Sequence, residues 1–134
     1  MRFVFLTMLL ATFSNQAMAG WVQVGSNANF NSYTDPSTLH KEGIKAMEGR
    51  KAKMLSLVDY ITPMTQEGKT VASLKAMHEF DCRQEQVRML YSTWYSGQMG
   101  SGVEVAGNFQ PENWRPIATH SMEEVLWKVA CSKN

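Results

Sequence analysis

The stretch VASLKAMHEFDC (residues 71–82), which runs on into RQEQVRMLYSTWY (83–95), decides the fold of this chain. Its first part alternates in polarity. The apolar face carries Ala72, Leu74, Ala76, Phe80 and Cys82, and the polar face carries Ser73, Lys75, Glu79 and Asp81. A period of two residues predicts a half-buried β-strand. His78 lies in the apolar set, and there we expect a hydrogen-bonded core residue, not a ligand.

A second strand is predicted after the charged RQEQ turn. One face carries Val87, Met89, Tyr91, Thr93 and Tyr95, and the other carries Arg88, Leu90, Ser92, Trp94 and Ser96. Because apolar side chains occur on both faces, this strand suits a position that is covered on both sides.

Upstream, KAKMLSLVDYI (51–61) has apolar residues on both faces and predicts a central strand. Thr62-Pro63 and Glu67-Gly68-Lys69 mark the turn that precedes Val71.

WVQVG (21–25) and NFNSYTD (29–35) predict two short strands. Asp35-Pro36-Ser37 predicts a helix start, although Gly43 limits that helix to one or two turns. The segment from Ile44 to Arg50 has no clear pattern.

The segment SMEEVLWKVAC (121–131) predicts a C-terminal helix. Ser121 and Glu124 have the spacing of a capping box. One helical face is apolar and carries Met122, Val125, Leu126, Val129 and Ala130. Because a helix this short is not stable alone, we expect this face to pack against the sheet.

The N-terminus, MRFVFLTMLLATFSNQAMAG, has the pattern of a secretory signal peptide. Arg2 precedes an apolar run, and Ala17 and Ala19 form a small-x-small cleavage site before Gly20. The apolar run is shorter than the ~20 residues of a membrane span, which disfavours an anchor helix. No cysteine lies near the cleavage site for lipid attachment. We therefore expect residues 1–19 to be removed, leaving one soluble domain, residues 20–134, without a membrane anchor.

Charge and cysteine content limit which partners and which cysteine chemistry we expect of this protein. The chain has 13 basic and 12 acidic residues, a balance that gives no reason to expect nucleic acid or anionic lipid as a partner. Both cysteines, Cys82 and Cys131, lie in the exported part, where an even number predicts a disulfide bond. A reactive Cys-His pair is less favoured, because His78 and Cys82 lie about 13 Å apart in an extended strand.

Two segments are candidates for binding. WYSGQMGSG (94–102) combines aromatic residues with glycines, so Trp94, Tyr95, Gln98 and Met99 form a candidate binding loop. The alternative is an ordinary glycine turn between strands. NWRP (113–116) pairs Trp114 with Arg115, residue types that are enriched at interaction hot spots or cap a core edge.

No catalytic, metal or cofactor site is predicted. His40, His78 and His120 are too dispersed for a metal signature. Glu123 and Glu124 are expected on the solvated side and the cap of the helix, and no nucleophile with a base can be assembled.

Several strings together carry a family resemblance. They are WVQVG, YTDPSTLHKEG, LVDY, HEFDC, NWRPIATHS and the terminal VAC. In order and spacing they resemble the surface-adhesin protein E family of small exported bacterial proteins. The resemblance implies an antiparallel sheet with a packed helix and a role in binding host extracellular-matrix and plasma proteins.

The sequence thus predicts an α+β domain of five or six antiparallel strands with a C-terminal α-helix packed on the sheet and one disulfide. The function expected is that of a periplasmic or secreted protein-binding module that contacts host or envelope proteins. The alternative is a periplasmic structural or envelope accessory protein without a host ligand.

Overall fold

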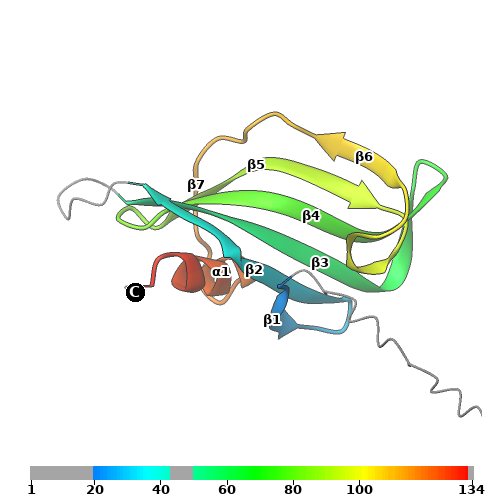
Figure 1. Ribbon diagram of the computed structural model, residues 1–134, viewed down its shortest axis with the longest axis horizontal. Helices are drawn as coiled ribbons and strands as arrows, with labels where there is room; N and C mark the ends of the chain where they lie inside the picture. Colours follow the sequence, from blue (N-terminus) through cyan, green and yellow to red (C-terminus); the bar gives the residue numbers. More distant parts are fainter. Residues whose placement is uncertain (1–19, 43–49, 133–134) are drawn as a thin grey trace, which may run out of the picture.

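Six strands lie side by side in chain order in the computed structural model of the protein, which describes residues 20–42 and 50–132 (Figure 1). They are β1 (Val22–Ser26), β2 (Phe30–Glu42), β3 (Lys51–Gln66), β4 (Lys69–Asp81), β5 (Gln86–Tyr95) and β6 (Glu104–Asn108). A short β7 (Arg115–Pro116) also pairs with β5, and every pairing is antiparallel. The 3₁₀ turn η1 (Gln98–Gly100) and the helix α1 (Met122–Ala130) complete these elements. The predicted α+β fold is confirmed.

Tight turns account for the order of the central strands. β3 and β4 are joined at Glu67 and Gly68, which both have positive φ, 49° and 76°. Such backbone angles fit the two-residue turns that match the twist of a hairpin. Between β4 and β5, Asp81 Oδ1 accepts hydrogen bonds from the backbone N–H groups of Arg83 and Gln84. The two strands predicted from residues 71–95 therefore pair as neighbours.

The helix start predicted at Asp35-Pro36-Ser37 is wrong, because β2 runs through these residues. Asp35 Oδ1 accepts hydrogen bonds from the Ser37 backbone N–H and hydroxyl, which is a local turn within the strand. The register shifts between Asp35, opposite Leu55, and His40, opposite Lys53. A side chain that resembles a helix cap thus forms a bulge in a long strand.

The turn predicted at Thr62-Pro63 is also misplaced. These residues lie inside β3, within a register shift between Asp59 and Met64, and the hairpin turn follows only at Glu67-Gly68. The unassigned segment Ile44–Arg50 lies outside the described residues except for Arg50, whose carbonyl accepts a hydrogen bond from the Cys82 N–H.

Helix α1 packs on one side of the sheet, here called the helix face and defined by the side chains of Met54, Phe80 and Val87. Figure 1 places α1 beside β2, near the C-terminal end of the described chain. The hydrophobic core joins sheet and helix, and its buried members are Ala52, Met54, Phe80, Val87, Leu126 and Ala130. Burial of this apolar surface stabilises the docked position of a helix that is too short to be stable alone.

The N-cap of α1 is as predicted, but the reciprocal bond of a capping box is absent, because the Ser121 N–H donates to the Ala118 carbonyl and the Glu124 carboxylate accepts from Lys128. The apolar stripe also needs one correction. Ser121 is the N-cap, and its hydroxyl accepts a hydrogen bond from the Glu124 N–H. Leu126 and Ala130 are buried, but Val125 is 38% exposed and so does not belong to the buried stripe. Val125 therefore lies at the margin of the contact between α1 and the sheet.

A disulfide joins Cys82 to Cys131, whose Cα atoms lie 5.5 Å apart, which confirms the predicted bond. Cys82 directly follows β4, and Cys131 is the C-cap of α1. Trp127 Nε1 donates a hydrogen bond to the Asp81 carbonyl beside the bridge. The last turn of the helix is thus fixed to the end of β4.

His78 is a core residue, as predicted. Its Nδ1 lies 2.9 Å from the Ser56 hydroxyl, and its ring stacks on Phe80 with centroids 5.9 Å apart. Burial lowers the pKa of His78 below its ordinary value, since the charged form would lose hydration. The imidazole therefore serves as a neutral, hydrogen-bonded part of the core.

Candidate functional site

The loop after β5 is held against the sheet on the side opposite the helix face. Ser73 Oγ donates to the Gly97 carbonyl and accepts from the Gly100 N–H, at 2.6 and 2.8 Å. The Met99 N–H donates to Asp59 Oδ1 at 2.8 Å. Ser73 and Asp59 are both buried. The loop is therefore a preformed feature of the surface and is anchored to two strands.

The backbone of this loop explains its glycines. Gly100 and Gly102 have φ values of 71° and 80°, and Met99 adopts the same left-handed region at 55°. A Cβ on Gly100 would lie 2.2 Å from Lys75 Cε, so a side chain there would displace Lys75. The glycines thus permit both the turn and its close approach to the sheet.

The four residues of the candidate binding loop do not share one surface. Tyr95 pairs with Ser73 across β4 and β5, so it lies on the same side as the loop, together with Met99, whose N–H bonds to Asp59 opposite Ser73. Trp94 pairs with Leu74 on β4 and Ala106 on β6, and directly paired residues project to the same face, here the helix face. Gln98 is exposed, and Met99 is half-buried.

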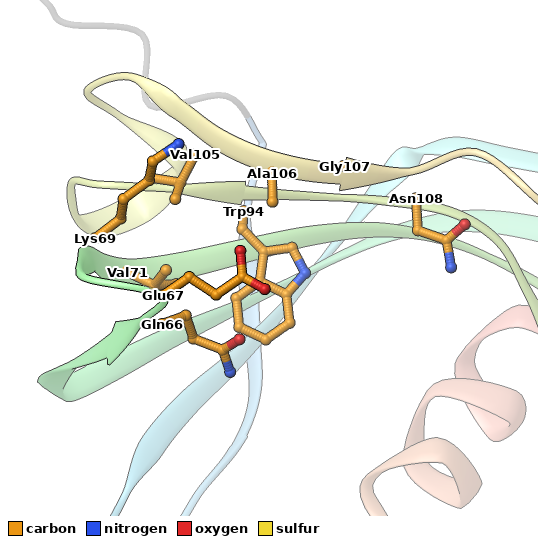
Figure 2. A pocket seen from close by; sticks show the side chains of 9 residues that line it. All are labelled: Gln66, Glu67, Lys69, Val71, Trp94, Val105, Ala106, Gly107 and Asn108. Atoms are coloured by element: carbon orange, nitrogen blue, oxygen red, sulfur yellow. The ribbon is translucent and has the colours of Figure 1, made fainter.

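Trp94 lines a shallow pocket of about 270 Å³ at the end of the sheet that α1 does not cover (Figure 2). The indole lies between the β3–β4 hairpin and β6. The pocket is lined by Gln66, Glu67, Lys69, Val71, Trp94, Val105, Ala106, Gly107 and Asn108. The indole is half-buried, and its N–H has no hydrogen-bond partner among the described residues. The pocket thus offers an aromatic wall and one available donor.

On the opposite side, Lys75 lies between two aromatic rings. Its Nζ is 5.2 Å from the centre of the Tyr95 ring and 6.0 Å from that of Trp21. Such cation–π contacts stabilise an ammonium group over an aromatic face. This contact fixes Tyr95 and the start of the described chain beside the loop.

A second cation–aromatic cluster surrounds Trp114. The guanidinium of Arg88 lies 4.7 Å from the centre of its ring, and Lys51 Nζ lies 5.6 Å away. Arg88 also forms an ion pair with the buried Glu79 at 2.7 Å. Trp114 therefore covers a charged part of the sheet, which corresponds to the edge-capping alternative for NWRP.

Arg115 turns away from this cluster to the helix. It forms a bidentate ion pair with Glu123 at the start of α1, and this bond raises the pKa of the guanidinium further. Glu123, expected in solvent, is thus partly covered and tethers β7 to α1. The sequence signal was an acidic residue in the first helical turn, but its partner could not be read from spacing.

Sequence reasoning also missed Lys75, Lys51 and Arg88 as partners of the aromatic residues. Each of the three lies on a strand, and its aromatic partner comes from another part of the chain, either from the neighbouring strand, as Tyr95 does, or from outside the strands, as Trp21 and Trp114 do, so the fold pairs each cation with its ring. That pairing is not encoded within any single strand.

The described residues contain one Ser-His contact, Ser56 with His78, and both residues are buried. Within residues 20–42 and 50–132, no group of three or more His, Cys, Asp or Glu residues is placed to hold a metal ion.

A comparison with family models matches residues 21–132 to Surface-adhesin protein E. The chain belongs to the surface-adhesin protein E family. The match spans every strand and the helix, and it confirms the resemblance found in the sequence. A search of the curated proteins found no match.

Solved structures of protein E from Haemophilus influenzae share the fold of this adhesin E domain. Crystal form II has a TM-score of 0.65 at 12% identity, and the match covers 84% of this chain and 87% of that chain. A second structure of the same protein has a TM-score of 0.62 at 14% identity, and the match covers 84% of each chain. At this identity the likeness shows the fold alone.

No helix in the described part of the adhesin E domain is both long and apolar enough to cross a membrane. The two cysteines form a disulfide, which fits an oxidising compartment outside the cytosol.

Proposed function

We propose that this chain is exported after cleavage between Ala19 and Gly20 and acts as an adhesin-like, protein-binding module. Host extracellular-matrix or plasma proteins are the proposed ligands. The observation that carries the proposal is the match to a surface-adhesin family over residues 21–132. An adhesin family favours binding over catalysis.

The anchored loop supports this role. A binding surface that is already ordered loses little conformational entropy when its ligand arrives. Ser73, which donates to the Gly97 carbonyl and accepts from the Gly100 N–H, and Asp59, which accepts from the Met99 N–H, hold the loop in place. Tyr95 and Lys75 lie beside them, and Gln98 projects into solvent. We propose Tyr95, Gln98 and Met99 as one part of the ligand surface, with Trp94 on the other face of the sheet.

A direct test immobilises residues 20–134 and measures binding to a panel of purified matrix and plasma glycoproteins, with serum albumin as the negative control. At least one glycoprotein should bind, and the double change Gln98→Ala and Met99→Ala should weaken it about tenfold, as loss of an interface contact does. Val125→Ala, an exposed change on α1, is the matched control. Binding to none of the panel would contradict the proposal.

The alternative is an envelope accessory protein that stays in the periplasm. It is favoured by one observation, since the two cysteines of the chain are joined to each other and neither can carry a lipid. Cell fractionation separates the two functions. Release into the medium or surface labelling of intact cells supports the adhesin, and recovery only after osmotic shock supports the accessory protein. N-terminal sequencing of the exported protein should begin at Gly20.

A further inference from the structure

Strand β6 forms one edge of the sheet. It pairs with β5, and no other strand of the described chain pairs with its outer side (Figure 1). The outer edge of a strand presents N–H and C=O groups that can pair with another extended chain. Many sheets block such an edge with lysine, proline or charged side chains. β6, with the sequence EVAGN, carries one charge, at Glu104.

The other edge of the sheet is less regular. In β1 the register shifts between Gln23 and Gly25, and a Cβ on Gly25 would lie 2.4 Å from Met122 Cε of the helix. A bulge and a neighbouring helix hinder the approach of another strand. β6 has a bulge of its own at Val105, but Ala106, Gly107 and Asn108 continue beyond it and are exposed.

The Trp94 pocket lies directly beneath β6. Ala106 faces Trp94 across the β5–β6 pairing, and Val105 to Asn108 form one wall of the pocket (Figure 2). Adjacent strands lie about 4.8 Å apart, so a side chain on a strand added outside β6 would meet Ala106 first. Because alanine is small, a large side chain can reach over it to the indole.

The chemistry of the pocket selects the kind of side chain. Trp94, Val71 and Val105 supply an apolar wall, while Glu67 and Lys69 carry opposite charges and leave no net charge to favour an ionic group. The Trp94 N–H and the amides of Gln66 and Asn108 can bond to the backbone of an incoming segment. An aromatic or large aliphatic side chain therefore fits best.

Together these features lead us to infer that β6 accepts an extended segment of a partner protein as an additional strand, with one large apolar side chain of that segment in the Trp94 pocket. Main-chain hydrogen bonds then supply affinity, and the pocket supplies specificity. The side chains of Val103 and Phe109, 71% and 67% exposed, flank the strand. The Phe109 ring stacks on Tyr91 and lies over Gly107, on the face of β6 opposite Ala106, so it offers an added strand apolar contact on that other face. This inference deepens the proposed protein-binding role and rests on it.

The test uses a random heptapeptide library displayed on phage and selected on residues 20–134. The selected peptide is synthesised, and each of its backbone amides is methylated in turn. Strand addition predicts that methylation abolishes binding at alternate residues and is tolerated between them, because only alternate N–H groups face β6. Equal tolerance along the peptide, or the absence of any selected sequence, would overturn the inference.

Two matched variants test the pocket. Ala106→Gln should weaken the peptide about tenfold, whereas Glu104→Gln, the same new residue outside the pocket, should change affinity less than about twofold. Equal effects of the two variants would contradict the inference. If the protein is instead a dimer that Ala106→Gln converts to a monomer while no peptide competes, the occupant is a second copy and the partner segment is wrong.

The outcomes separate this inference from the proposed function. If a matrix protein binds but Ala106→Gln leaves that binding unchanged, strand addition fails and the adhesin role stands. If peptides bind with the alternate pattern while no panel protein binds, strand addition stands and the host ligand is wrong.

Discussion

The backbone N–H of Met99 donates a hydrogen bond to Oδ1 of Asp59, 2.8 Å away, although 40 positions separate the two residues in the chain. The contact joins the loop after β5 to the middle of β3. It makes the position of the loop depend on a buried carboxylate in the sheet.

Asp59→Ala should release this loop and lower the free energy of unfolding by about 1–3 kcal/mol, because the Met99 N–H loses its partner. Hydrogen exchange at Met99 should accelerate, and the unfolding midpoint should fall. Gln98→Ala is the control, since Gln98 is exposed and its change should leave both measurements as they are. Unaltered exchange at Met99 in Asp59→Ala would show that the loop is held by other contacts.

Trp94→Ala should lower the unfolding midpoint. A fully buried tryptophan costs about 3–5 kcal/mol when truncated, and a half-buried one should cost less, about 2 kcal/mol. Gln98→Ala should lower the free energy of unfolding by under about 0.5 kcal/mol, as changes at exposed positions do, and the half-buried Met99→Ala should lower it by less than Trp94→Ala does. Chemical denaturation gives all three values, and equal midpoints for Trp94→Ala and the wild type would place the indole outside the packed structure.

Three substitutions in and beside the terminal helix should lower the free energy of unfolding by different amounts. Ser121→Ala removes the cap of the Glu124 N–H and should cost roughly 1 kcal/mol. Leu126→Ala should cost about 2–5 kcal/mol, since it empties core volume. Val125→Ala, on the exposed side one residue earlier, should cost under about 0.5 kcal/mol. The order of the three midpoints is the result that matters, and a large loss in Val125→Ala would mean that α1 docks by another face.

The disulfide predicts that alkylation without reduction labels neither cysteine, and that reduction under denaturing conditions labels both. Replacing both cysteines with serine should lower the free energy of unfolding by about 4 kcal/mol in the chain-entropy model. Mass spectrometry checks the first expectation and denaturation the second. Labelling of the native protein would refute the bridge.

His78 predicts a pH dependence of stability. Burial lowers the pKa of His78 in the folded protein, whereas in the unfolded chain it stays near about 6.5. As the pH falls below about 6.5, the unfolded chain binds the proton more readily, so stability declines, by at most about 1.4 kcal/mol per pH unit. Above that pH this contribution is constant.

The variant His78→Asn should show a flatter profile than the wild type between pH 7.5 and 5.5. Thermal unfolding at fixed ionic strength measures both profiles. Parallel profiles would mean that His78 is protonated in the folded state as easily as in the unfolded one.

The strands at 71–82 and 87–95 and the terminal helix could be predicted, because each depends on a local pattern that the sheet does not override. The predicted helix start at Asp35 failed for a non-local reason. The hydrogen bond from the Ser37 N–H to Asp35 occurs both at helix caps and at strand bulges. Residues 40–42 form a strand and not a helix because they pair with residues 51–53. Thr62-Pro63 failed similarly, since β3 absorbs it in a bulge.

The candidate site was predictable only as a segment. Trp94 and Tyr95 are neighbours in sequence, yet a strand sends consecutive side chains to opposite faces, so one lies by the pocket and the other by Lys75. β6, which completes the pocket, has too little apolar alternation in EVAGN to be recognised as a strand.

The bond between Cys82 and Cys131 also determines how the domain would respond to mechanical tension. A pull on the chain that follows Cys131 reaches the end of β4 through a covalent bond, so α1 cannot be peeled from the sheet first. The disulfide keeps Cys82 and Cys131, which are 49 positions apart in sequence, together even after unfolding, so roughly 170 Å of chain cannot be extended. Under shear, the force would therefore bypass the chain from β5 to α1 through the disulfide, and extension of the chain would have to begin in the strands before Cys82.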